Sequence, residues 1–313
     1  MVKRFIAFVL CVLMLWGCSA NEIHTQQFTT IFAMDTVMSF DIWGTDAKDG
    51  AAAIAARIAQ LERDWSATNP DSILGRLNAG AEVAMSPEES ALMAKIEVLS
   101  LRTGGAFYPR LHAVSEVWGF YNDEHHVPGQ AEIAEAMNKQ EWDLGAAMKG
   151  FVGQECVALL SEMEIDRALL NLGGNIQTYG EKPDGSPWRV AVQNPDLSDD
   201  YLGIVAVTGT MSVVTSGDYQ RYFELNGKRY HHILDPETGY PAESGLASVT
   251  VICRDGLTAD ALSTALFVMG LEDAAAFWRN SNDFEAVFVT KDGKIYATEG
   301  VDLSECEYEV IKR

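Results

Sequence analysis

Residues 248–269 read SVTVICRDGLTADALSTALFVM and contain the two kinds of element from which the fold is built. The first part, Ser248–Cys253, is rich in β-branched residues and predicts a strand. The second part, Thr258–Met269, has the length and apolar content that predict a helix. A strand therefore runs into a helix, and the rest of the chain shows how such units are combined.

Strands are predicted both as hairpins and in alternation with helices. Asn226-Gly227 separates two strand-like runs, which is a strong signal for a two-residue hairpin turn. Strands are expected at 31–43, 167–172, 188–193, 202–208, 219–225 and 228–234, with two more around Asp292-Gly293. Helices are expected at 51–65, 86–99, 146–163 and 272–279, and Ser86-Pro87-Glu88-Glu89 has the form of a capping box. This mixture predicts an α+β fold with mixed sheets and packed helices.

The N-terminus has the pattern of an export signal. A basic stretch, Met1–Arg4, precedes the apolar run Phe5–Trp16, which is too short for a membrane span of ~20 residues but suits a signal peptide. Cys18 directly follows this run, as in a bacterial lipobox. We expect a signal peptide at 1–17, a lipidated Cys18 with a tether to residue 30, and one domain at 31–313. The alternative is an ordinary signal with a chance Gly-Cys pair.

The composition limits the partners. Removal of residues 1–17 leaves 21 basic and 45 acidic residues, a net charge of −24. So acidic a chain should not bind nucleic acid or anionic lipid headgroups, and a lipid anchor would supply attachment to the bacterial cell membrane. We expect an extracytoplasmic, lipid-anchored protein. Three other cysteines would remain, and a bridge between Cys253 and Cys306 stays open.

The helix predicted at 258–269 carries oxygen ligands near its start. Asp260 and Thr264 are four residues apart and share one helix face, with Ser263 beside them. One carboxylate with one or two hydroxyls suits Mg²⁺, which completes its shell with water and substrate phosphate. The alternative is structural, because helix starts collect such residues for capping.

Two glycine-containing segments could bind a phosphate-bearing ligand. Asp143 and Lys149 flank a predicted helix start, where backbone N–H groups and the helix dipole favour anions. A plain strand-to-helix turn with a surface lysine would have the same sequence. Gly173-Gly174 follows an apolar strand and either allows close approach of a ligand or makes an ordinary turn.

Two adjacent histidines end a predicted hairpin strand. Side chains of His231 and His232 should point to opposite faces, so at most one readily faces a site. The spacing His232-x-x-Asp235 could hold an imidazole in one tautomer and make it a base. A structural histidine is the more common explanation.

The order of the motifs is more informative than any one of them. The chain contains DLGAAMKGF (143–151), NLGGNIQTYG (171–180), TSGDYQRYF (215–223), HHILDPETGYP (231–241) and TADALSTALFVMG (258–270). Upstream lie FAMDT (32–36), SILGRLN (72–78), TGGAF (103–107) and Trp118-Gly119-Phe120. From Phe32 to Gly270 this series resembles the ApbE family, the FAD:protein FMN transferases.

The resemblance implies an ApbE-like catalytic domain that binds FAD as its substrate, with Mg²⁺ beside the pyrophosphate. The metal ligands it implies are Asp260, Thr264, Ser263 and the backbone carbonyl of Ala146. The FAD contacts it implies are Met34, Ala106, Phe107, Tyr108, Asp143, Lys149, His232, Ile233 and Leu234. His232 is also the candidate general base. The chain departs from the family pattern at Asp35, Tyr108, Arg110, Met148 and His231.

The activity that the resemblance implies is transfer of FMN from FAD to a Ser or Thr hydroxyl of an exported or membrane redox protein, with release of AMP. Two alternatives remain open from the sequence. One is a Mg²⁺-dependent FAD pyrophosphatase that gives FMN and AMP, and the other is a non-catalytic flavin-binding lipoprotein.

Overall fold

The computed structural model describes residues 25–121, 124–195 and 200–313, and its fold is mixed α+β, as the sequence predicts. The predicted signal segment 1–17 and the lipidation site Cys18 lie outside the described residues. Among the helices that are described, none combines the length and the apolar character needed to cross a membrane.

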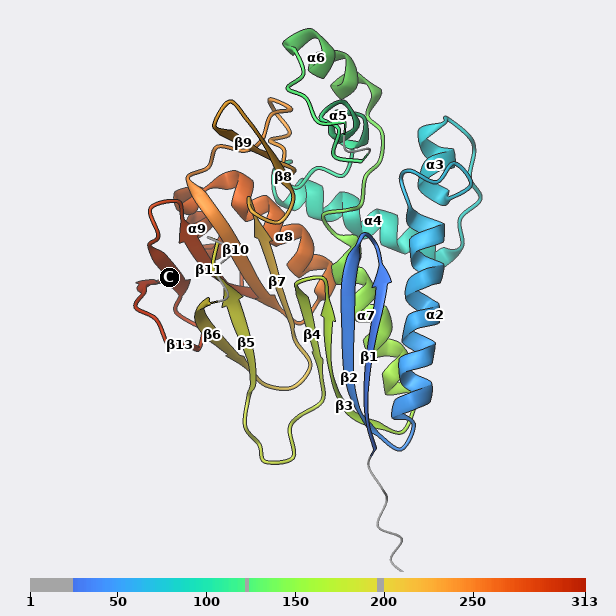
Figure 1. Cartoon of the computed structure of the whole chain (residues 1–313), viewed down its shortest axis with the longest axis vertical. Helices are drawn as coiled ribbons and strands as arrows, with labels where there is room; N and C mark the ends of the chain where they lie inside the picture. Colours follow the sequence, from blue (N-terminus) through green and yellow to red (C-terminus); the bar gives the residue numbers. More distant parts are fainter. Residues whose placement is uncertain (1–24, 122–123, 196–199) are drawn as a thin grey trace, which may run out of the picture.

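A nine-stranded sheet runs through the molecule (Figure 1). In spatial order its strands are β1 (Thr25–Ala33), β2 (Thr36–Gly44), β3 (Ile165–Leu172), β4 (Asn175–Tyr179), β7 (Ser212–Gly217), β10 (Leu246–Cys253), β11 (Phe284–Thr290), β12 (Ile295–Thr298) and β14 (Glu309–Ile311). Neighbours pair antiparallel except β12 and β14, which are parallel. A small sheet contains β13 (Leu303–Ser304), β6 (Tyr201–Val207) and β5 (Trp188–Gln193), and β8 (Tyr222–Leu225) forms a hairpin with β9 (Lys228–His231).

Helices and the small sheet cover opposite faces of the large sheet, whereas α5 (His112–Val117) and α6 (Gln130–Lys139) pack with the β8–β9 hairpin. The other helices are α2 (Ala47–Trp65), α3 (Ile73–Asn78), α4 (Pro87–Arg102), α7 (Met148–Ser161), α8 (Gly256–Met269) and α9 (Leu271–Arg279). Adjacent residues of β10 show the two layers: Val251 packs with α8 and α9, whereas Ile252 packs with the small sheet. Every residue of β10 is buried, and its residues are apolar except for Ser248 and Thr250.

The helices α7 and α8 cross at two glycines. A Cβ atom on Gly150 would lie 2.0 Å from the carbonyl oxygen of Gly256, and one on Gly256 would lie 2.4 Å from the carbonyl oxygen of Gly150. Only glycine fits at this distance, because such contacts are far inside van der Waals separation. The crossing places the start of α7 beside Asp260 on α8.

The N-terminal part of the domain differs from the prediction. Residues 25–30 of the expected tether and the single strand expected at 31–43 form instead a hairpin of β1 and β2, while residues 18–24 of the tether lie outside the described residues. The turn residues Met34 and Asp35 have φ of 49° and 57°. Left-handed turns normally use Gly or Asn, so Met-Asp gave no turn signal in the sequence.

Other local predictions agree closely with the structure. Ser86 caps α4 with a complete capping box that includes the side chain of Glu89. Asn226-Gly227 forms the β8–β9 turn with φ of 53° and 78°, although both strands are shorter than expected. The elements β4, β7, α3, α5 and α6 were not predicted.

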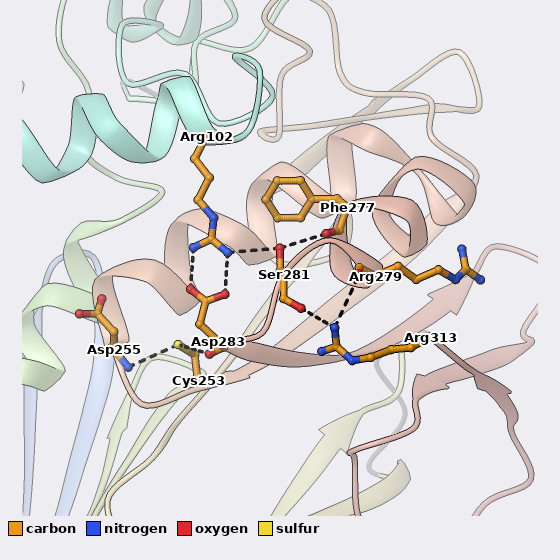
Figure 2. Close-up of polar contacts among 8 residues, drawn as sticks. All are labelled: Arg102, Cys253, Asp255, Phe277, Arg279, Ser281, Asp283 and Arg313. Atoms are coloured by element: carbon orange, nitrogen blue, oxygen red, sulfur yellow. Dashed lines mark hydrogen bonds and ion pairs between the residues drawn. The ribbon is translucent and has the colours of Figure 1, made fainter.

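The three cysteines of the described residues are free thiols. The Sγ of Cys253 is 3.2 Å from the carbonyl oxygen of Asp283 and accepts a hydrogen bond from the N–H of Asp255 (Figure 2). Arg102 from α4 binds both carboxylate oxygens of Asp283 at 2.6 Å, and Arg313 reaches the carbonyl of Ser281. These contacts fix the α9–β11 connection and the C-terminus beside α4.

Substitution of Gly150 by Ala is expected to lower the free energy of unfolding by about 1–3 kcal/mol, a usual cost of overpacking. The loss would occur although Ala favours a helix over Gly by roughly 1 kcal/mol. Urea denaturation measures the change in the free energy of unfolding. Gly153→Ala is the matched control on α7, because its methyl group would meet only the side chain of Gln177, at 3.2 Å. Equal stability of the two variants would contradict the role of the crossing.

Candidate active site

A cleft of about 760 Å³ opens at one end of the large sheet. This volume lies within the range of about 300–1,000 Å³ that is common for small-molecule sites. The β1–β2 and β3–β4 turns, the end of α2, and the starts of α7 and α8 contribute to its walls. The sequence-predicted residues that line the cleft are Met34, Ala106, Phe107, Tyr108, Asp143, Ala146, Lys149, His232, Ile233, Leu234, Asp260 and Thr264.

Asp260 is a buried carboxylate at the base of the cleft. Its side chain is 4% exposed, and Oδ2 accepts a hydrogen bond from the backbone N–H of Gly150 at 2.8 Å. Oδ1 has no hydrogen-bond partner within the described part of the chain. A buried charge of this kind is stable only when paired or when it coordinates a cation.

The bond from Gly150 also caps the start of α7. Gly150 is the third residue of this helix, and the first N–H groups of a helix have no acceptor within the helix. Here the N–H of Gly150 donates to Asp260, and no backbone hydrogen bond to the Ala146 carbonyl is found among the described residues. Asp260 therefore supplies an acceptor for the start of α7, and Asp260 and Ala146, which precedes this helix, both line the cleft as candidate oxygen ligands.

Three hydroxyl groups lie beside Asp260. Ser216 Oγ on β7 is 2.8 Å from Ser263 Oγ and 3.2 Å from Thr264 Oγ1. Thr264 lines the cleft, but Ser263 is fully buried and donates to the carbonyl of Asp260 at 2.8 Å. Ser263 does not line the cleft, so the candidate ligands that do are Asp260, Thr264 and Ala146 with its carbonyl. Three hard oxygen donors fit Mg²⁺.

The predicted phosphate corner at the start of α7 has few free N–H groups. Those of Ala147 and Met148 donate to the carbonyl of Leu144 at 2.9 and 2.8 Å, and that of Gly150 is taken by Asp260. The expected cradle of backbone N–H groups is therefore largely absent there. Lys149 lines the cleft and supplies a cation for a phosphate instead.

Asp143 is held as a hydrogen-bond acceptor in the cleft wall. Its Oδ1 accepts from the N–H of Gly145 at 2.8 Å, and its Oδ2 accepts from the hydroxyl of Tyr121. Burial, reinforced by the negative charge of Asp143, raises the pKa of Tyr121 well above its ordinary value. The phenol therefore stays protonated and keeps Asp143 in place.

His232 enters the cleft as a neutral imidazole. Its Nδ1 lies 3.1 Å from the carbonyl oxygen of Arg221, and because a carbonyl only accepts, Nδ1 must carry the proton. The lone pair is then on Nε2. Burial and the positive charges of Arg221 and Lys149 lower the pKa of His232 to about 3.

The predicted role of Asp235 as the partner of His232 is wrong. Asp235 Oδ1 accepts from the backbone N–H of Glu237 at 2.8 Å, which is a local turn contact. The Arg221 carbonyl orients His232 instead. His231 points to the opposite side, as expected for a neighbouring strand residue, and packs edge-on against Phe267 with 5.5 Å between ring centroids.

Two of the residues that depart from the family pattern, Tyr108 and Arg110, contact identifiable side chains. Tyr108 lines the cleft and its hydroxyl contacts Gln140. Arg110 does not line the cleft, since it forms an ion pair with Glu97 and stacks over the ring of Trp142 at 4.0 Å. Tyr108 is therefore the substitution that can touch a ligand, and Arg110 is structural.

The other departures lie at the rim or beneath the cleft. Asp35 sits at the β1–β2 turn, 4.0 Å from the guanidinium of Arg221. Met148 lines the cleft from α7 but is only 7% exposed and belongs to the core.

The β3–β4 turn is made by Gly173 and Gly174 with φ of 69° and 94°, so these glycines both form a turn and line the cleft.

Sequence reasoning missed Ser216, Arg221 and Tyr121, all of which line the cleft. Ser216 and Arg221 lie inside the motif TSGDYQRYF, so the motif order pointed to the segment but not to the individual roles. Tyr121 follows Trp118-Gly119-Phe120 and carried no signal of its own.

The fold and the site together define a candidate phosphoryl-transfer enzyme of the α+β class. A set of oxygen ligands for a divalent cation, a lysine and a neutral histidine meet in one cleft. Comparison with known proteins makes the assignment specific. The sequence model of the ApbE family matches residues 34–288, and the chain belongs to this family.

Characterised relatives and a solved structure agree with this assignment. The FAD:protein FMN transferase of Treponema pallidum is 33% identical over 281 residues, which span 78% of this chain and 78% of the relative. The enzyme of the same name from Escherichia coli K12 is 30% identical, with 94% of each chain covered. The crystal structure of the ApbE protein from Thermotoga maritima superposes with a TM-score of 0.81 at 31% identity, covering 88% of this chain and 97% of that one.

Proposed function

We propose that this chain transfers FMN from FAD to a Ser or Thr hydroxyl of an acceptor protein, in a Mg²⁺-dependent reaction that releases AMP. Family membership and the names of the relatives support the flavin transfer. The observation that carries the proposal is the meeting of Asp260, Thr264 and the Ala146 carbonyl with Lys149 and His232 in one cleft.

Different residues of the cleft would bind the metal ion and the phosphate. Asp260, Thr264 and the Ala146 carbonyl would hold Mg²⁺, and Lys149 would bind a phosphate of FAD. When bound, Mg²⁺ neutralises charge on the pyrophosphate oxygens. The Gly173-Gly174 turn lets a flat ligand approach the backbone, because neither residue has a side chain.

His232 would accept the proton of the attacking hydroxyl at Nε2. The hydroxyl oxygen forms a bond to the FMN-side phosphorus, the bond from that phosphorus to the bridging oxygen breaks, and AMP leaves with that oxygen. The Arg221 carbonyl keeps the proton of the free enzyme on Nδ1, so Nε2 is the open position. Water in place of the hydroxyl would give hydrolysis, so the fit of the acceptor decides the outcome.

Substitution of Asp260 by Ala should reduce Mg²⁺-dependent transfer by at least about 100-fold, because the change removes a metal ligand and frees the N–H of Gly150. The assay is incubation with FAD, Mg²⁺ and a co-expressed exported redox protein, followed by mass spectrometry for a covalent FMN adduct. Asp273→Ala, on the exposed side of α9, is the charge-matched control. Full activity of D260A would show that the site is wrong, and free FMN without adduct would indicate a pyrophosphatase.

Substitution of His232 by Asn should slow transfer by about 10²- to 10⁴-fold, the usual contribution of a general base, with little change in FAD affinity. Since burial and nearby cations lower the pKa of His232 to about 3 in the free enzyme, the imidazole is neutral above that pH and should impose no acid limb on kcat/KM between pH 5 and 8. Arg221→Gln removes one of the charges that lower this pKa, so the pKa of His232 should be higher in R221Q. An H232N enzyme with an unchanged rate excludes the base assignment.

We also propose that the protein is exported and anchored to the bacterial cell membrane through Cys18. The support is the sequence pattern of residues 1–18. Cys18→Ser should move the protein from the membrane fraction to the soluble extracytoplasmic fraction and abolish labelling by a radioactive fatty acid. Membrane retention of C18S with its apolar segment cleaved would rule out the lipid anchor.

A further inference from the structure

A second group of candidate ligands lies outside the proposed magnesium site. His112 is the first residue of α5, Glu116 lies one turn later on the same helix, and Glu141 belongs to the segment between α6 and α7. One potential ligand atom from each residue lies within 4.8 Å of the other two. The backbone N–H of His112 also donates to the carbonyl of Glu141 at 3.2 Å, which holds the two segments together.

The imidazole of His112 has a buried nitrogen that lacks a hydrogen-bond partner among the residues that the structure describes. The residue is 8% exposed, and the unpartnered atom is Nδ1. The ring packs against Tyr121 with 4.9 Å between centroids, which leaves the edge of the ring toward the two glutamates. Buried polar atoms are normally satisfied, so an unpartnered ring nitrogen beside carboxylates indicates a missing ligand.

The two carboxylates lack a cation. Neither Glu116 nor Glu141 forms an ion pair or a side-chain hydrogen bond with any other described residue. Like charges this close disfavour each other unless a positive charge lies between them. Glu116 is exposed and Glu141 is half-buried, so an ion could enter from solvent.

We propose that His112, Glu116 and Glu141 bind a divalent transition-metal ion of the zinc type, separate from the magnesium site at Asp260. An imidazole nitrogen with carboxylate oxygens is a ligand set for such ions, whereas Mg²⁺ prefers oxygen alone. Histidine and glutamate four residues apart share one helix face, as metal-binding pairs do.

The geometry requires only a small adjustment. Bonds of about 2.0–2.2 Å to zinc place ligand atoms roughly 3.5 Å apart in a tetrahedral site. The observed separations of up to 4.8 Å close to this value if the flexible glutamate side chains turn inward. A water molecule would complete the coordination.

The ion would stabilise one wall of the main cleft. Glu141 lies two residues before Asp143, and His112 packs on Tyr121, whose hydroxyl binds Asp143. A metal bridge between α5 and this segment would therefore fix the position of Asp143. The role is structural, and the proposal does not depend on the reaction that the cleft performs.

The test is zinc binding by the purified full-length chain in detergent, after chelation and with excess Mg²⁺ to fill the cleft. Isothermal titration should show one Zn²⁺ per chain, and X-ray absorption should show an imidazole ligand. His112→Gln, and separately Glu141→Gln, should weaken the affinity at least about tenfold, as loss of metal-site groups does. Zinc should also raise the melting temperature, since it binds only the folded state.

Two control variants make the result specific. His126→Gln removes an exposed histidine that pairs with Glu132 at 3.2 Å, and Asp260→Ala removes the magnesium site. Both should leave the zinc affinity unchanged. Absence of zinc binding, equal affinity of H112Q and the unmodified chain, or loss of binding in D260A would each overturn the proposal. Circular dichroism of H112Q and E141Q confirms that they fold.

Discussion

The contact between Gly150 and Gly256 is the constraint on which the rest of the site depends. At this point α7 and α8 are close enough that a single added carbon would overlap a carbonyl oxygen. The approach brings the carboxylate of Asp260 to the first turn of α7, where it takes the N–H of Gly150. Ala146 lies just before this helix and lines the same cleft. One packing contact thus positions two of the three candidate oxygen donors.

The parts of the fold that follow from local chemistry could be predicted from the sequence. The capping box at Ser86, the Asn226-Gly227 turn and the strand predicted at 248–253 from its β-branched residues were each correct, because their residues act on their own backbone. The Met34-Asp35 turn was missed for the opposite reason. Its left-handed backbone is imposed by the pairing of β1 with β2, and its residues carry no preference for it.

In the site, too, local spacing predicted some features and missed those that depend on packing. Helical spacing identified Asp260 and Thr264, since both lie on one face of one helix, but it also suggested Ser263, which the structure turns toward Ser216 and the interior. Whether a hydroxyl faces a cleft depends on how strands and helices pack, and spacing does not contain that information. The partner of His232 is a backbone carbonyl, that of Arg221, and no side-chain motif could have named it.

Electrostatics links the acidic composition to a metal requirement. The chain carries a formal charge of −22, and the buried carboxylate of Asp260 would repel a pyrophosphate placed beside it. Lys149 and Arg221 supply local positive charge, but together with burial, which is the main cause, they also lower the pKa of His232 to about 3. A bound anion would offset those two cations and raise the basicity of Nε2 toward the range where it can take a proton. The bound pyrophosphate, which needs the divalent cation, would therefore also make His232 a better base. An efficient proton acceptor would then form only when the cleft is filled.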